Sequence, residues 1–134
     1  MNITARKNDI GRPSKGRIET NIHAIAESER MTPDQQALQD AARRFATTEL
    51  PALARRLEAQ DESLPDAWMK RFAELGVFGV NLPEEYGGQG LGHFEAVLVL
   101  EEFAKVSSAV AMPVFEANFG PMTVIAHFGS DELK

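Results

Sequence analysis

The chain has 134 residues and carries 20 acidic against 14 basic side chains, so its formal net charge at pH 7 is −6. A chain of this length is typical of one domain and can bury about two thirds of its unfolded surface, enough for a core without metal or disulfide staples. It contains no cysteine, which excludes disulfide scaffolds, thiolate zinc sites, iron–sulfur clusters and cysteine nucleophiles.

The charge is unevenly distributed along the chain. Residues 1–18 hold five basic side chains and one acidic one, whereas residues 19–134 hold 9 basic and 19 acidic ones. The acidic body argues against nucleic-acid binding. Because glycine and proline interrupt the basic segment, residues 1–30 are predicted to form a disordered arm.

The arm does not resemble a targeting segment. No apolar stretch follows its basic residues, which disfavours a secretory signal, and Asp9 and Glu19 disfavour a mitochondrial transit peptide. A cytoplasmic location is therefore expected, with the mitochondrial matrix as the alternative.

The first helix is predicted to begin at Thr32-Pro33-Asp34-Gln35, which combines a capping residue, a proline at the first helical position and a capping-box amide. One apolar stripe follows at helical spacing: Leu38, Ala41, Ala42 and Phe45. Pro51 is expected to separate this helix from a second helical stretch, which carries Leu50, Leu53 and Leu57 and ends near Asp61.

A third helix is predicted to open at Pro65 and to end at Gly76, with Trp68, Phe72 and Leu75 as its apolar stripe. Residues 77–80 are predicted to form a short extended segment.

Four glycines occur in the loop at residues 84–92. They give G-x-G-x-G, and His93 stands where the third glycine of a dinucleotide-binding G-x-G-x-x-G would be. No buried strand precedes this loop, so a structural turn is favoured over a Rossmann site.

No catalytic or metal-binding constellation is evident. The pairs Glu84-Glu85 and Glu101-Glu102 are interpreted as surface charges, because adjacent residues on a helix point about 100° apart and cannot form a facing dyad. The three histidines (His23, His93 and His127) have no metal-ligand spacing.

Residues 106–130 contain a single charged side chain, Glu116. The run is long enough to suggest a membrane span, but Pro113 and Gly120-Pro121 divide it into shorter pieces, so buried helices are predicted instead. The preceding helices can cover only part of such an apolar surface. Because residues 129–134 also carry a helix-start signal, the sequence is expected to be the front portion of a longer polypeptide.

From Met31 to Lys134 the chain resembles the flavin-dependent acyl-CoA dehydrogenases. The similarity lies in motifs that occur in the family's order: Phe72-Ala73-Glu74-Leu75-Gly76, Leu82-Pro83-Glu84-Glu85-Tyr86-Gly87-Gly88-Gln89-Gly90-Leu91-Gly92, Leu100-Glu101-Glu102-Phe103-Ala104 and Gly129-Ser130-Asp131-Glu132-Leu133-Lys134. The resemblance implies an all-α amino-terminal domain at residues 31–134, an orthogonal or up-down bundle of five to six helices, from a chain with three domains.

The family resemblance also implies a function. Members remove the α-proton of an acyl-CoA thioester with a carboxylate base and pass the β-hydrogen as hydride to FAD. The base and most flavin contacts lie in the later domains, so no catalytic residue is assigned here and the chain alone is expected to be inactive. Implied partners are acyl-CoA, the remaining domains, a homo-oligomer, and electron-transfer flavoprotein or another acceptor.

By resemblance, this domain supplies a wall of the acyl pocket at Ala111, Met112, Phe115 and Phe119. Two phenylalanines would shorten the pocket and favour a short, branched or aromatic acyl group. From the residues alone, these positions are better explained as ordinary core, and only with the resemblance do the two interpretations become equally supported. Related flavoenzymes (an acyl-CoA oxidase, a nitroalkane oxidase or a flavin monooxygenase) and a non-catalytic helical subunit remain alternatives.

Overall fold

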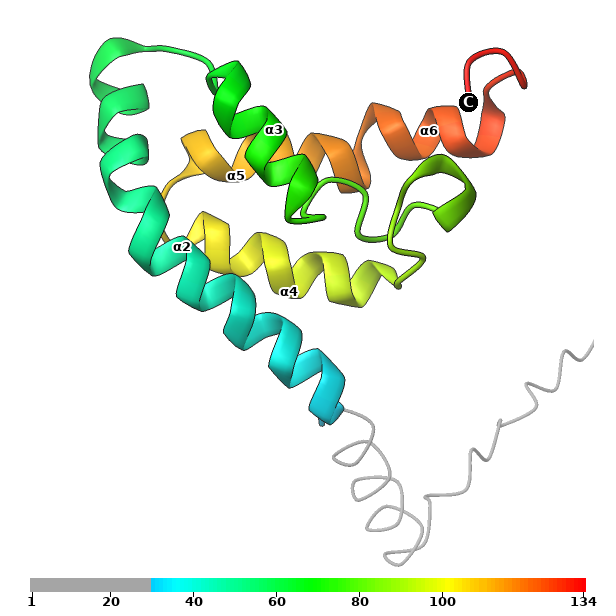
Figure 1. Ribbon diagram of the computed structural model, residues 1–134, viewed down its shortest axis with the longest axis horizontal. Coiled ribbons are helices and arrows are strands. Elements are labelled where there is room, and N and C mark those ends of the chain that lie inside the picture. Colours follow the sequence, from blue (N-terminus) through cyan, green and yellow to red (C-terminus); the bar gives the residue numbers. More distant parts are fainter. Residues whose placement is uncertain (1–29) are drawn as a thin grey trace, which may run out of the picture. The chain divides into compact units, whose positions relative to one another are not determined.

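The computed structural model describes residues 30–134, which form helices and turns without a strand (Figure 1). The predictions for residues 1–29, His23 included, lie outside this range. The helices in chain order are α2 (Pro33–Gln60), α3 (Asp66–Glu74), the 3-10 turn η1 (Glu84–Tyr86), α4 (His93–Ala104), α5 (Ser108–Phe119) and α6 (Pro121–Phe128).

The predicted all-α class is confirmed. Only Gly120 separates α5 from α6, and α6 continues in nearly the direction of α5 (Figure 1). The number of independent helices is therefore slightly below the five to six that were predicted.

The start of α2 is the predicted capping box. Thr32 Oγ1 accepts the backbone N–H of Gln35 at 3.2 Å, and Gln35 Oε1 accepts the backbone N–H of Thr32 at 2.9 Å. These two bonds satisfy backbone donors that have no partner inside the helix.

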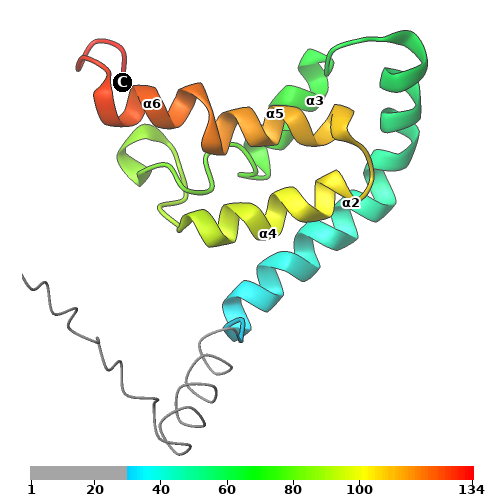
Figure 2. The same ribbon diagram turned by 180° about the vertical axis from the view of Figure 1, so that it is seen from behind.

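The prediction that Pro51 divides this region into two helices is wrong, since α2 runs unbroken through Pro51 to Gln60. Proline cannot donate to the carbonyl one turn earlier, and here the helix bends rather than ends (Figures 1 and 2). Leu50, Leu53 and Leu57 are all buried, so the second half of α2 keeps its core contacts across the bend.

The core is built around the ring of Phe72, which is fully buried. Its centroid lies 5.3 Å from that of Phe103, 5.7 Å from Phe78, and 6.1 Å from both Phe45 and Trp68. The rings meet nearly edge to face, an arrangement that adds to the stabilisation from burial alone. Four separate segments of the chain are joined by this cluster.

The loop after α3 differs from its prediction. Gly76 has φ of +71° and ends α3 as expected, but residues 78–81 form turns rather than an extended segment. Gly79, with φ of +82°, permits this turn. The cause lies in a distant residue, Asn118, described below.

Helices α4 and α5 run antiparallel and are joined by the short connection at residues 105–107 (Figure 2). Helix α2 packs across both of them. As a result, the amino-terminal end of α4 lies beside the carboxyl-terminal end of α5.

Candidate functional site

Helix α5 is apolar around most of its circumference but is covered on one side only. Its buried side carries Val110, Ala111, Val114 and Asn118. The other positions form two further surfaces, so the prediction that the preceding helices cover this segment only in part is supported.

The first surface contains three of the four residues predicted to line the acyl pocket. Met112 and Phe115 are 50% and 43% exposed, and Phe119 is partly buried. Spacings of three and four residues place them on one side of α5, which we call the ring face. The fourth residue, Ala111, is 5% exposed and belongs to the core cluster beside that face.

The aromatic rings of the ring face form a row. Phe115 and Phe119 are stacked with centroids 5.8 Å apart and planes inclined by 29°. The imidazole of His93 lies 6.0 Å from the Phe119 ring at 48°. His93 was not predicted as a site residue, because its contact depends on the antiparallel pairing of α4 and α5 and leaves no spacing signal in the sequence.

The second surface is an apolar trough centred on Met122. Three hollows, of about 340, 140 and 120 Å³, share this residue. Their linings come from α3, α5, α6 and the glycine loop, and include Phe78, Pro113, Tyr86 and Ile125. The described fold thus leaves α6 largely uncovered, since none of its residues is buried.

By length and composition, residues 108–128 could cross a membrane. One such segment is weak evidence, because core helices of other proteins have the same properties. Gly120 also interrupts the helix within this segment, as the sequence predicted.

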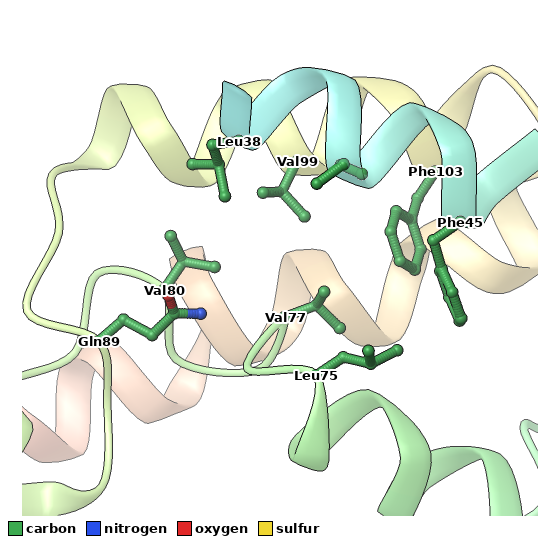
Figure 3. A pocket seen from close by; sticks show the side chains of 10 residues that line it. Leu38, Phe45, Leu75, Val77, Val80, Gln89, Val99 and Phe103 are labelled. Carbon is green, nitrogen blue, oxygen red and sulfur yellow. The ribbon is translucent and has the colours of Figure 1, made fainter. Parts of the chain in front are cut away.

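A further hollow of about 140 Å³, partly open to solvent, lies between α2, α4 and the loop after α3 (Figure 3). The predicted apolar stripe of α2 lines one side of it, and Val77, Val80, Val99 and Phe103 line the others. Gln89 supplies its main polar side chain, and the amide of Gln89 donates to the carbonyl oxygen of Gly76. Its lining is apolar apart from Gln89, so this hollow offers no titratable or nucleophilic side chain for chemistry.

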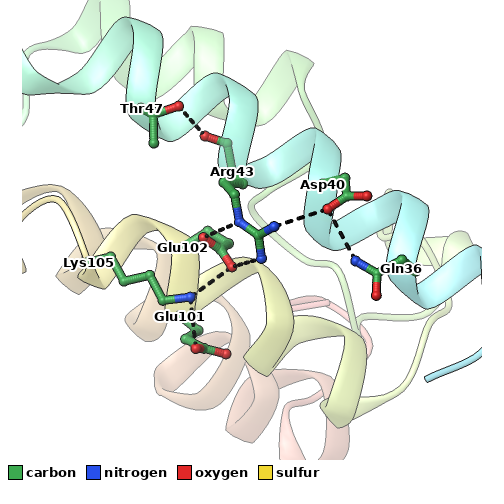
Figure 4. A network of polar contacts seen from close by, with 7 residues as sticks. All are labelled: Gln36, Asp40, Arg43, Thr47, Glu101, Glu102 and Lys105. Atoms are coloured by element: carbon green, nitrogen blue, oxygen red, sulfur yellow. Dashed lines mark hydrogen bonds and ion pairs between the residues drawn. The ribbon is translucent and has the colours of Figure 1, made fainter. Parts of the chain in front are cut away.

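The prediction that Glu102 is a surface charge is wrong, since its side chain is only 2% exposed. Its carboxylate accepts bonds from Arg43 Nη2 at 3.0 Å, from Arg43 Nε at 3.3 Å and from Lys105 Nζ at 2.9 Å (Figure 4). The hydrogen bonds from Arg43 are the main reason that the pKa of Glu102 lies below its ordinary value. Glu101, by contrast, is exposed as predicted and also pairs with Lys105.

The bonds at Glu102 join α2 to α4. They neutralise a carboxylate that would otherwise be unpaired in the interior, which is costly. The carboxylate is fully engaged by Arg43 and Lys105, so we assign it a structural role.

Asn118 explains the turn at residues 78–81. Its Oδ1 accepts the backbone N–H of Val80 at 2.7 Å, and its Nδ2 donates to the carbonyl oxygens of Val77 at 2.9 Å and Val114 at 2.8 Å. A buried side chain of α5 thereby replaces the partners that an adjacent strand would give to this loop.

The glycine loop is structural, as predicted. The Gly88 N–H donates to the Pro83 carbonyl oxygen at 3.1 Å, and the Gly90 N–H donates to the Leu82 carbonyl oxygen at 2.8 Å. A Cβ at Gly88 would collide with the backbone of Leu82, so the close approach requires glycine. These N–H groups bond within the loop itself and do not form a phosphate cradle.

No site for a metal or for a flavin is evident within residues 30–134. No three His, Cys, Asp or Glu side chains there could hold a metal ion. The four hollows described above are mostly apolar, whereas the pyrophosphate of a flavin needs hydrogen-bond donors or positive charge. The described residues therefore do not fit FAD by themselves.

Comparisons with known proteins identify the class. The sequence model for "Acyl-CoA dehydrogenase, N-terminal domain" matches residues 32–134. The chain therefore belongs to the acyl-CoA dehydrogenase family and contains its amino-terminal domain, as the motifs indicated.

Several curated relatives are similar to this chain. A 3-sulfinopropanoyl-CoA desulfinase of Paraburkholderia xenovorans is 38% identical over 106 residues, which are 78% of this chain and 26% of the relative. The acyl-CoA dehydrogenase FadE12 of Mycobacterium tuberculosis is 44% identical over 73 residues, 54% of this chain and 18% of the relative. The mitochondrial short-chain specific acyl-CoA dehydrogenase of Sus scrofa is 29% identical over 113 residues, which are 84% of this chain and 27% of the relative. The chain thus spans between 18% and 27% of the length of these relatives.

Proposed function

We propose that this chain is the amino-terminal domain of a FAD-dependent acyl-CoA dehydrogenase and that its ring face forms one wall of the acyl pocket. The observation that carries the proposal is the set of partly exposed apolar side chains on α5, at the positions that the family resemblance assigns to the substrate. An exposed patch of this kind on an otherwise charged domain is typical of a binding surface.

The part played by this chain is binding and shielding from water. Met112 and Phe115 present thioether and aromatic surface toward the space beside α5, while Ala111 is buried in the core next to them. An acyl chain laid on this surface loses contact with water, and removal of water also strengthens the electrostatic interactions at the reacting carbons.

The redox chemistry would come from the remaining domains. In a complete enzyme, bound FAD would accept the β-hydrogen of the acyl group as hydride. The flavin, the base and the donors to the thioester carbonyl are all assigned to parts of the enzyme beyond these residues, so the chain alone is inactive in this proposal. The same parts, in a homo-oligomer, would cover the trough around Met122, and electron-transfer flavoprotein or another acceptor would reoxidise the flavin.

Anaerobic titration of the complete flavoenzyme with acyl-CoA tests the function. The proposal predicts that flavin absorbance bleaches on addition of a short or branched acyl-CoA and that the enoyl-CoA product forms in equal amount. An oxidase would give the same bleaching but would return to the yellow form with oxygen at a catalytic rate. A protein without flavin would favour the non-catalytic subunit.

A desulfinase is the second candidate, favoured by the 38% identity with the Paraburkholderia protein. A sulfinate is anionic and would need a cationic or hydrogen-bonding partner. The ring face itself offers only apolar side chains, and the polar groups near it are the imidazole of His93 on α4 and the carboxylate of Glu116 on α5. The ring face therefore fits an apolar acyl group better. Sulfite release from 3-sulfinopropanoyl-CoA without flavin reduction would support the desulfinase instead.

A further inference from the structure

We infer that His93 is a specificity-determining residue, and that the row His93, Phe119 and Phe115 selects an acyl group that carries an aromatic ring. This inference deepens the proposed function and rests on it. It adds a residue from a second helix, α4, to a wall that the sequence placed on α5 alone.

The geometry of the row is the first argument. The three rings follow one another with centroid separations of 6.0 and 5.8 Å, both within the range of interacting aromatic pairs. Phe115 and Phe119 are nearly parallel, at 29°, whereas His93 is tilted by 48° against Phe119. The rings form a bent aromatic surface rather than a flat one.

Exposure is the second argument. His93 is exposed, Phe115 is 43% exposed and Phe119 is partly buried. The outer two rings therefore have surface to offer a ligand, while Phe119 anchors the row against the core. A phenyl ring in this position gains stacked or edge-to-face contacts that a flexible alkyl chain does not.

The chain also contains a matched comparison for His93. Phe94 is the next residue on α4, is aromatic and is 52% exposed, but it makes no ring contact with Phe119 or Phe115. Because successive helical residues point about 100° apart, Phe94 lies on a different side of α4. A change at Phe94 therefore tests for general effects of altering an exposed ring at this helix terminus.

The experiment uses the complete flavoenzyme and three variants: His93→Leu, His93→Phe and Phe94→Leu. For each, kcat and KM are measured with 3-phenylpropanoyl-CoA and with hexanoyl-CoA, together with flavin content and Tm. The selectivity is the ratio of kcat/KM for the two substrates. Leucine removes the ring while keeping a side chain of similar volume, and phenylalanine keeps an aromatic ring.

The wild-type enzyme is expected to use 3-phenylpropanoyl-CoA at least as well as hexanoyl-CoA. His93→Leu should lower the selectivity about three- to tenfold, through a higher KM for the phenyl substrate, with normal flavin content. His93→Phe should restore the selectivity, and Phe94→Leu should leave it within about twofold of the wild type.

Unchanged selectivity in His93→Leu, or an equal loss with both substrates, would overturn the inference while leaving the dehydrogenase function intact. The same shift in Phe94→Leu would also overturn it. If the wild-type flavin were reduced by neither substrate, both the proposed function and this inference would fail, so the two failures are distinguishable.

Discussion

The side chain of Asn118 on α5 accepts the backbone N–H of Val80 at 2.7 Å, across 38 residues of sequence. The bond is buried, and two further bonds from Asn118 Nδ2 reach the carbonyl oxygens of Val77 and Val114. A single side-chain amide therefore fixes the loop after α3 against α5, the helix that carries the ring face.

Replacing this amide should be costly. Asn118→Leu has similar volume but leaves the Val80 N–H and the Val77 carbonyl buried without partners, so we expect a loss of about 2–4 kcal/mol in the free energy of unfolding. Urea denaturation of the chain measures it. Glu116→Gln, an exposed change on the same helix, should alter stability by less than about 0.5 kcal/mol. Equal stability in both variants would contradict the assigned role of Asn118.

The glycine loop permits a paired test. At Gly88 an added Cβ would lie 2.5 Å from the Leu82 carbonyl carbon, whereas at Gly87 it would meet nothing within 4 Å. Gly87→Ala should cost only the penalty of its φ of +80°, about 1–2 kcal/mol. Gly88→Ala should cost about 1–3 kcal/mol more than that, because the backbone must move. Denaturation midpoints of the two variants compare them directly; the reverse order would refute the close packing of this loop.

The buried Glu102 predicts a pH dependence of stability. Its pKa is lower in the folded chain than its ordinary value of 4.5, mainly because of hydrogen bonds from Arg43. A lowered pKa means that the stabilisation is present above about pH 4.5 and is lost as the pH falls through the folded value. Glu95, whose pKa is lowered by a bond from Gln35, adds a loss in the same direction.

Denaturation midpoints between pH 7 and pH 3 test this prediction. Glu102→Gln should lower the midpoint at pH 7 and should reduce its fall on acidification. Glu101→Gln, the exposed neighbour, should leave both nearly unchanged. A pH profile of Glu102→Gln identical in shape to that of the wild type would show that this carboxylate is not responsible.

Local signals predicted the helices well. The capping box at Thr32, the apolar stripes and the glycine at the end of α3 act through neighbours within one or two turns, so the sequence carries them directly. The glycine loop was also assigned correctly to a structural turn, because its spacing does not match the dinucleotide motif.

Each prediction that was wrong or incomplete concerns a residue whose structure depends on contacts between distant segments. Pro51 was expected to end α2, but burial of the leucines that follow keeps the helix intact across the bend. Glu102 was taken as a surface charge because its partner Arg43 lies 59 residues earlier. The turn at residues 78–81 follows from Asn118, and the ring contact of His93 follows from the pairing of α4 with α5. Neither helical periodicity nor a short sequence motif indicates such contacts.

The acyl-pocket assignment gives a prediction for Phe115 and Phe119. In the complete enzyme, Phe115→Ala and Phe119→Ala should extend the range of accepted straight acyl chains, because each removes a large side chain from the wall. Val110→Ala, a buried change on the same helix, should lower stability by about 0.5–1.5 kcal/mol or more without changing the preferred chain length.

The most direct test measures kcat/KM of the wild type and these variants with a series of acyl-CoA substrates. Acyl groups of about four to twelve carbons cover the range from short to long chains. We predict that the optimum chain length becomes longer in Phe115→Ala and Phe119→Ala and is unchanged in Val110→Ala. A uniform decrease at every length, with the optimum unmoved, would mean that α5 supplies core to the fold and no wall to the substrate.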